Sequence, residues 1–232
     1  MQEIKQLDLF NEVERRHPDA FIKGRRGNRD AVTLIELGGK DFRTPEMVSL
    51  LKEYWQPTED DILYIINLEK IDVLTPSAAK ILVESVPDIA SKYKTPVIFI
   101  EVRPKAMEQL ESATRVCDPQ KLVWAIDEDR KPHLVGPVEK KKKLKELLDL
   151  LGKQGPASAS QLAIITEGAT SKKAVGNLSG YLNDLFNAGL VSREKVTALD
   201  RDDDAERGWT YIYRTAPTSF QNSKPEAIIR KP

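Results

Sequence analysis

Short apolar runs alternate with helical patterns through the first half of the chain. Four runs have the β-branched content and the flanking turn residues of strands, at 31–37, 61–68, 96–101 and 122–126. The segments that begin at Pro45, Pro76 and Pro104 carry apolar residues at helical spacing. Pro87 should kink or shorten the second of these helices. The alternation predicts an α/β domain over 31–131, a small and largely parallel sheet covered by helices.

A different pattern follows residues 132–137, whose prolines and glycine we interpret as a linker. Leucines at helical spacing predict a first helix from Val138 to about Gly152. A second begins near Ser158, with Leu162 and Ile165 facing inward, and Thr170 or Ser171 caps a third. Gly189 ends that helix, and 190–191 and 210–214 are expected to be two paired strands. The pattern predicts an α+β domain over 138–217.

The two ends of the chain have weaker patterns. Within the leader, residues 1–30, Ile4, Leu7 and Val13 are spaced as on one face of a helix that ends before Pro18. Residues 21–30 contain four basic residues around two glycines, which favours a solvated hairpin or loop over a nucleic-acid contact. Residues 218–232 have no period and predict a flexible tail or an extended docking segment.

Composition limits the function classes. The chain has 232 residues, and 36 basic residues balance 36 acidic ones, so its overall charge favours neither nucleic acid nor membrane. The part from Val138 onward has a small basic excess, and the part before it a small acidic excess. Cys117 is the single cysteine, which excludes an internal disulfide and fits a reducing compartment. With no signal peptide and no apolar stretch of membrane-spanning length, we expect a cytoplasmic protein.

No pattern in the sequence predicts a catalytic centre. His17 and His133 are isolated histidines without a partner motif, and Cys117 fits a structural thiol. There is no phosphate-binding GxxxxGK[ST] loop and no Cys/His pair at metal-ligand spacing. We therefore expect a protein that is not an enzyme and that holds no cofactor and no metal.

The α/β domain resembles the STAS domain, the fold of bacterial anti-anti-sigma factors. The resemblance rests on a strand that ends in Gly-Gly before Asp41-Phe-Arg-Thr-Pro45, on the apolar strand at 62–68 with Ile71-Asp-Val-Leu74, and on the strand at 97–102 followed by Pro104. In that family a serine after the central strand is a phosphorylation switch. Pro76 occupies its place here, so the resemblance implies that this switch is absent.

The junction at Thr75, Pro76 and Ser77 remains a candidate site for a partner or an anion, because ligands meet such sheets where strands end and helices begin. Thr75 or Ser77 could also be a displaced phosphate acceptor. A purely structural role is favoured: Thr75 fits a helix N-cap and Pro76 fits the first helical position.

The second domain resembles a winged helix-turn-helix, on the basis of the segment Leu182-Asn-Asp-Leu-Phe-Asn-Ala-Gly-Leu-Val191 followed by a strand. In that family the third helix enters the major groove through its exposed N-terminal residues. The resemblance therefore implies DNA contacts from Ser171, Lys172, Lys173, Asn177, Gly180 and Tyr181. Lys142 and Lys143 are further candidates, because the helix dipole disfavours cations in the first turn and an external anion would explain them.

Two functions remain open at this point, beside a weaker third, an enzyme acting at the junction from Thr75 to Ser77. A DNA-binding regulatory protein would contact duplex DNA with the second domain, while the first domain pairs with a second copy or takes a signal from a protein partner. The acidic segment 200–206 argues against DNA contact, because its carboxylates would repel phosphate if it formed the wing. The segment does not predict a calcium site either, because it lacks the glycine and glutamate pattern of a calcium loop. The alternative is a non-catalytic adaptor subunit of a larger complex, whose winged helix makes protein contacts. No membrane partner is expected.

Overall fold

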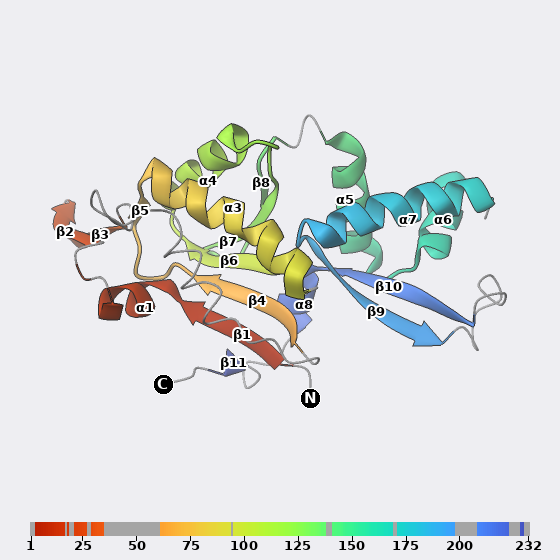
Figure 1. Ribbon diagram of the computed structural model, residues 1–232, viewed down its shortest axis with the longest axis horizontal. Coiled ribbons are helices and arrows are strands. Elements are labelled where there is room, and N and C mark those ends of the chain that lie inside the picture. Colours follow the sequence, from red (N-terminus) through yellow and green to blue (C-terminus); the bar gives the residue numbers. More distant parts are fainter. Residues whose placement is uncertain are drawn as a thin grey trace.

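The computed structural model describes residues 3–16, 18, 21–26, 29–34, 61–93, 95–137, 141–168, 171–197, 208–222 and 228–229. These residues form seven helices and eleven strands, a mixed α/β chain with a mostly parallel central sheet (Figure 1). The helix expected at Pro45, the Gly-Gly end of the first strand and the acidic segment 200–206 lie outside the described residues.

A six-stranded sheet lies at the centre of the molecule, in the order β11-β1-β4-β6-β7-β8. Neighbouring strands are parallel except for β7 and β8, which are antiparallel. The strands are β1 (Glu3–Asp8), β4 (Asp61–Asn67), β6 (Val97–Val102), β7 (Val123–Asp127), β8 (Pro132–Val135) and β11 (Ile228–Ile229). Three strands expected from the apolar runs are thereby confirmed as parallel neighbours.

Both faces of this sheet are covered. Helices α3 (Pro76–Tyr93) and α4 (Pro104–Val116) pack on one face, where Tyr64 and Ile66 are buried (Figure 1). The alternate residues Leu63 and Ile65 lie in a second cluster with α8 (Ala216–Asn222). Burial on both faces explains why the sequence of the central strand is an unbroken apolar run. Pro87 lies within α3, and the helix is not shortened there.

The structure corrects the interpretation of the N-terminal leader as one helix. Residues 3–8 form β1, which pairs with β4 in parallel register, and only Leu9–Arg16 form a helix, α1. The Asp8 carboxylate accepts the backbone N–H of Asn11 at 3.0 Å and so begins that helix. The apolar spacing fitted a helix, but pairing with a buried neighbouring strand overrides a local pattern in so short a segment.

A strand covers the described part of the expected run 31–37, but it does not belong to the central sheet. Residues 29–34 form β3 (Arg29–Leu34), which pairs antiparallel with β2 (Phe21–Arg26) and parallel with β5 (Val73–Leu74). These strands make a separate three-stranded sheet at one end of the molecule (Figure 1). An apolar run predicts a strand but not the sheet that it joins. The hairpin expected at 21–30 is confirmed.

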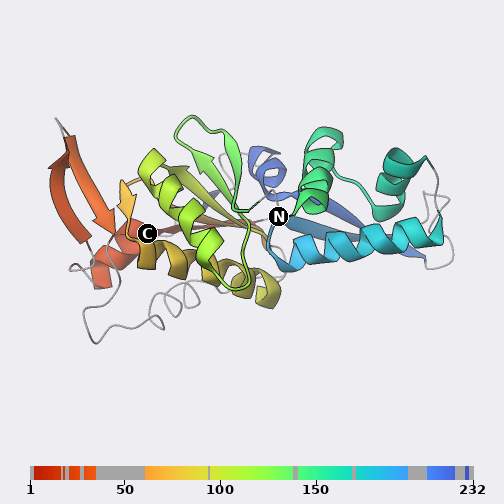
Figure 2. The same cartoon turned by 90° about the horizontal axis from the view of Figure 1, so that it is seen from above.

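Three helices and a hairpin form a lobe at the other end of the molecule (Figures 1 and 2). Its elements are α5 (Lys142–Gln154), α6 (Ala159–Glu167), α7 (Lys172–Asn187), β9 (Val191–Thr197) and β10 (Trp209–Thr215). Ser158 and Gln161 form a capping box at the start of α6. Leu162, Leu178 and Leu182 are buried in the lobe core. Ile165, expected to face inward, is instead 48% exposed.

The expected linker and tail both contain regular structure. Within 132–137, β8 pairs with β7 at the edge of the sheet, where a proline at the first strand position is tolerated. Within 218–232, α8 continues to Asn222 and β11 pairs with β1. Glycine, proline and polar residues mark interruptions along the chain, but they do not exclude edge strands or short helices that tertiary contacts hold.

The lobe joins the sheet through the end of α7. The backbone N–H of Val97 donates to the Gly189 carbonyl at 3.1 Å, and the Trp124 indole donates to the Leu190 carbonyl at 2.9 Å. The backbone N–H of Ala216 donates to the same Leu190 carbonyl at 3.3 Å. The C-terminal end of α7 is therefore fixed against the sheet.

Across the described ranges, none of the helices has the length and apolar character that crossing a membrane requires.

Candidate nucleic-acid interface

The six residues predicted on the third helix lie on or directly before α7, and all are exposed: Ser171, Lys172, Lys173, Asn177, Gly180 and Tyr181. Ser171 is the N-cap, and its hydroxyl accepts the backbone N–H of Ala174 at 3.1 Å. The opposite side of α7, with Leu178, Leu182 and Leu185, is buried. The predicted residues thus share the solvent side of one helix.

Lys172 and Lys173 bring positive charge to the positive end of a helix dipole. The first turn of α7 has no acidic residue, and neither lysine forms an ion pair with any residue in the described ranges. Both the dipole and the lysine charges favour an anion at this end. The start of α7 is therefore suited to phosphate.

Gly176 and Gly180 lie four residues apart on the exposed side of α7. A glycine inside a helix costs about 1 kcal/mol relative to alanine. Packing against the described residues does not require either glycine, because a Cβ atom built at each position meets none of them within 4 Å. Together they leave an exposed stretch of helix backbone that another molecule can approach closely.

The hairpin after α7 adds cations that the sequence interpretation missed. The Arg193 guanidinium lies 4.0 Å from the Phe186 ring centroid and 4.5 Å from that of Tyr211, and it donates to the Asn183 side chain at 3.1 Å. The Lys195 ammonium lies 4.3 Å from the Trp209 ring centroid. The alternation of basic residues on β9 opposite aromatic residues on β10 was the available signal.

The predicted lysines of α5 do not join this surface. Helix α5 begins close to β8, whereas α7 begins at the far end of the lobe (Figure 1). The Lys143 ammonium pairs with Glu146 at 3.6 Å, and Lys142 is exposed. The neighbouring Lys141 donates to the Gln120 carbonyl at 3.0 Å, and burial followed by repulsion from Lys121 lowers its pKa. The start of α5 is thus joined to the α/β part.

The junction at Thr75, Pro76 and Ser77 has the geometry of a helix start. The Thr75 hydroxyl accepts the backbone N–H of Ala78 at 3.4 Å, and its carbonyl accepts that of Ala79 at 2.9 Å. Pro76 is exposed at the first position of α3, and Ser77 is half-buried. The capping interpretation is confirmed, while contact with a partner or an anion stays a prediction.

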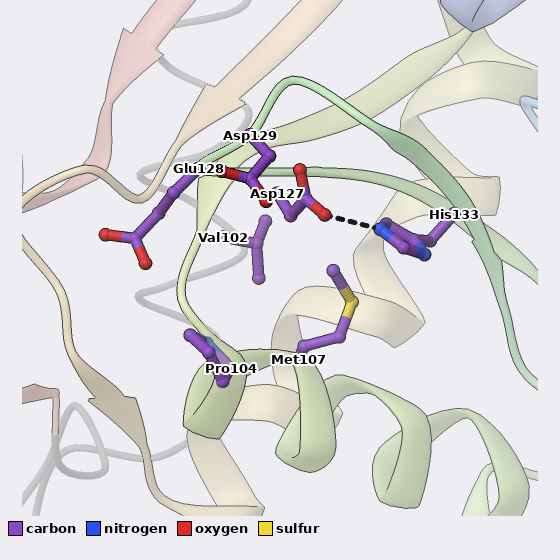
Figure 3. A pocket seen from close by; sticks show the side chains of 7 residues that line it. All are labelled: Val102, Pro104, Met107, Asp127, Glu128, Asp129 and His133. Carbon is purple, nitrogen blue, oxygen red and sulfur yellow. Dashed lines mark hydrogen bonds and ion pairs between the residues drawn. The ribbon is translucent and has the colours of Figure 1, made fainter.

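A small hollow of about 260 Å³ lies between α4 and the β7–β8 turn (Figure 3). Val102, Pro104 and Met107 line it together with carboxylates of the turn. His133 is not isolated here, because its Nε2 atom lies 2.8 Å from an Asp127 carboxylate oxygen. This hydrogen bond is the main cause of the lowered pKa of Asp127. The acidic lining does not suit phosphate.

Metal ligands do not gather in the described ranges, where no group of three or more His, Cys, Asp or Glu residues could hold an ion. Cys117 is buried, and burial raises the pKa of its thiol. A buried thiol with a raised pKa is a weak nucleophile, which fits the structural role expected for it.

Glu101 is a strained and crowded residue at the carboxyl end of β6. Its φ of 54° falls where the register between β6 and β7 shifts, as at a β-bulge. Burial, and after it repulsion from Glu69, raises the pKa of the Glu101 carboxyl. The folded protein therefore binds a proton at this side chain more tightly than the unfolded chain does.

Replacing Glu101 by Gln should stabilise the protein increasingly as the pH rises. A raised pKa stabilises the folded state at pH values below the ordinary pKa of about 4.3, and this contribution is lost as the pH rises through the folded-state pKa. Thermal unfolding measured from pH 4 to pH 7 should show the Tm of the Gln variant rising relative to that of the wild type. A difference that stays constant or shrinks over this range would contradict the assignment.

Comparison with known proteins gives no match. No described protein family, no curated protein and no solved structure matches the chain. The function is therefore inferred from the residues and their geometry.

Proposed function

We propose that this protein is a DNA-binding regulatory protein. In this proposal the lobe contacts duplex DNA through α7, and the α/β part pairs with a protein partner or a second copy. The exposed face of α7 carries the proposal, since Lys172 and Lys173 lack partners among the described residues and Gly176 and Gly180 leave the backbone open.

The order of elements in the lobe supports a winged-helix arrangement. Three helices precede an antiparallel pair, β9 and β10, and the third helix is the one whose N-terminal residues are exposed. In helix-turn-helix proteins the recognition helix contacts base edges through these residues. On that arrangement Asn177 could bond an adenine edge, while the two lysines would contact phosphates.

The proposed role of the α/β part is docking. A STAS-like arrangement is supported by the parallel order β4-β6-β7 and by α3 and α4 on a single face of the sheet. Pro76 has no hydroxyl, and the nearby Thr75 hydroxyl already caps α3. These observations favour recognition of a protein partner over a phosphorylation switch.

Binding to a fluorescent random-sequence duplex, followed by anisotropy at several salt concentrations, tests the proposal. Replacing Lys172 and Lys173 by Gln should weaken binding about tenfold. It should also reduce the salt slope, the slope of log affinity against log salt concentration, by roughly two, since each lost phosphate contact lowers that slope by about one. The matched control replaces Lys142 and Lys143, which carry the same charge at the other end of the lobe.

Two outcomes would contradict the DNA proposal. The first is wild-type protein that does not bind the duplex at low salt. The second is equal loss of binding in the control and in the α7 variant, which would show a general effect of charge.

Exposed apolar side chains favour the adaptor as the second candidate function. Ile164 is 47% exposed and Ile165 is 48% exposed on α6, and Tyr181 is 39% exposed on α7. Exposed apolar and aromatic residues are typical of protein contacts. Folded protein without affinity for DNA would favour this adaptor function, with α6 and α7 as the protein-binding surface.

A further inference from the structure

We infer that Arg193 is a positioning residue of the proposed DNA interface, which holds the β9–β10 hairpin against α7 so that Lys195 meets the duplex backbone together with the start of α7. This inference rests on the proposed function and assigns different roles to the two cations of the hairpin. Arg193 acts on the neighbouring elements of the protein, and Lys195 acts on phosphate.

Arg193 joins three elements of the lobe. It is the third residue of β9, and its guanidinium carbon lies 4.0 Å from the ring centroid of Phe186 in α7 and 4.5 Å from that of Tyr211 in β10. One guanidinium N–H donates to the side chain of Asn183, also in α7, at 3.1 Å. Because only three residues separate α7 from β9, these contacts fix the direction in which the hairpin leaves the helix.

The charge of Arg193 is engaged within the lobe. The side chain is half-buried, and aromatic rings stabilise a cation that is partly removed from water. Burial raises the pKa of the Tyr213 hydroxyl, and the charge and hydrogen bond of Arg193 act against this shift. A planar guanidinium stacks on rings and donates in fixed directions, whereas a lysine ammonium is a compact point charge. These contacts are therefore specific to arginine and hold segments of the protein together.

Lys195 has the properties of a phosphate contact. It is exposed, and it lies on the same face of β9 as Arg193, two residues nearer the far end of the hairpin. Its ammonium lies 4.3 Å from the ring centroid of Trp209 and forms no ion pair with any residue that the structure describes. The far end of the hairpin and the start of α7 both point away from the sheet (Figures 1 and 2). The hairpin thus carries an exposed cation toward the end of the lobe where Lys172 and Lys173 lie.

The two roles predict that substitutions of Arg193 and Lys195 are not additive. If Arg193 positions Lys195, loss of the Arg193 contacts also removes the phosphate contact of Lys195, so the second substitution adds nothing to the first. If Arg193 contacted phosphate itself, the two losses would add, and a lysine in its place would keep the charge that binds phosphate.

Anisotropy of the full chain with the fluorescent duplex, at several salt concentrations, tests the inference. Lys195→Gln should weaken binding about threefold and reduce the salt slope by roughly one. Arg193→Lys keeps the charge but loses the ring stacking, and it should show the same loss of affinity and the same change in slope. The double variant should bind no more weakly than either single variant.

Arg214→Lys is the matched control. Arg214 lies on the opposite face of the same hairpin, where its guanidinium pairs with Glu194 at 3.3 Å. The same exchange of guanidinium for ammonium should leave DNA binding unchanged there. Circular dichroism checks that each variant is folded. If Arg193→Lys does not fold, Asn183→Ala replaces it, since removal of this exposed side chain should give a smaller loss that is absent in the Lys195→Gln background.

The outcomes separate this inference from the proposed function. Arg193→Lys protein that binds as tightly as the wild type, or losses that add in the double variant, would overturn the inference and leave the proposed function standing. Equal losses in Arg193→Lys and Arg214→Lys would do the same, because they would show a general loosening of the hairpin. Wild-type protein that does not bind the duplex at low salt would overturn both.

Discussion

Gly189→Ala should lower the free energy of unfolding by about 3 kcal/mol, through two effects that act at one atom. Gly189 has a φ of 76°, a left-handed conformation that costs a residue with a side chain roughly 1–2 kcal/mol. A Cβ atom there would also lie 2.6 Å from the Cβ of Ala90 in α3. Overpacking of this kind typically costs another 1–3 kcal/mol. The backbone cannot shift easily, because the Gly189 carbonyl accepts the N–H of Val97.

Gly168→Ala is the matched control for this prediction. Gly168 ends α6 with a φ of 69°, but a Cβ atom there would meet no described residue within 4 Å. It should therefore show only the conformational cost of roughly 1–2 kcal/mol. Urea denaturation measures both variants, and Ala90→Gly should recover part of the loss in Gly189→Ala. Equal losses in the two variants, or no recovery, would contradict the close contact between α7 and α3.

Replacing Gly176 and Gly180 by Gln should make the protein more stable and its DNA binding weaker. Glutamine is a better helix former than glycine by about 0.5 kcal/mol or more at each position. Both positions are exposed, and an added Cβ atom would meet no residue that the structure describes within 4 Å, so folding gains from the substitution. On the proposed interface, however, two longer side chains hold the helix backbone away from the duplex, and affinity should fall about tenfold, or roughly 1.4 kcal/mol.

Gly152→Gln in α5 separates the two effects. Gly152 is also an exposed helical glycine, and its added Cβ would meet nothing within 4 Å in the described part of the chain. It should stabilise the fold by a similar amount per site without changing DNA affinity. Urea denaturation measures the stability of each variant, and fluorescence anisotropy measures its affinity for the duplex. Stabilised α7 variants that bind DNA as well as the wild type would show that these glycines do not face the duplex.

The parts of the fold that the sequence predicts well are those with one dominant local signal. The run 61–68 is apolar on both faces, and such a run has few alternatives to a central strand. The caps at Ser158 and Ser171 fix the starts of α6 and α7 by hydrogen bonds within four residues. These features need no knowledge of distant segments.

The segments that were wrongly interpreted depend on distant partners. Strand β1 forms beside β4, more than fifty residues later, and β11 pairs with β1 across nearly the whole chain. A six-residue segment with mixed polarity fits either a strand or a helix until its neighbour is known. The pairing of His133 with Asp127 depends on a nearer partner, since the turn between β7 and β8 brings the two side chains together.

The candidate site also has residues that local periodicity predicts and residues that only the packing of distant segments places. Helical periodicity was sufficient to place the exposed residues of α7, because the buried leucines determine the opposite side. The position of Lys142 and Lys143 relative to α7 needed the packing of three helices. Arg193 was missed because its contacts with Phe186 and Tyr211 join a helix to two strands.

Photo-crosslinking from position 177 tests the central claim most directly. A benzophenone amino acid replaces Asn177 on the exposed face of α7, and another replaces Glu108 on the exposed side of α4 as the control. Illumination with duplex DNA should give a covalent protein–DNA adduct from position 177 and none from position 108. Adducts from position 108 alone, or none from position 177 with protein that binds the duplex, would contradict the claim that α7 contacts DNA.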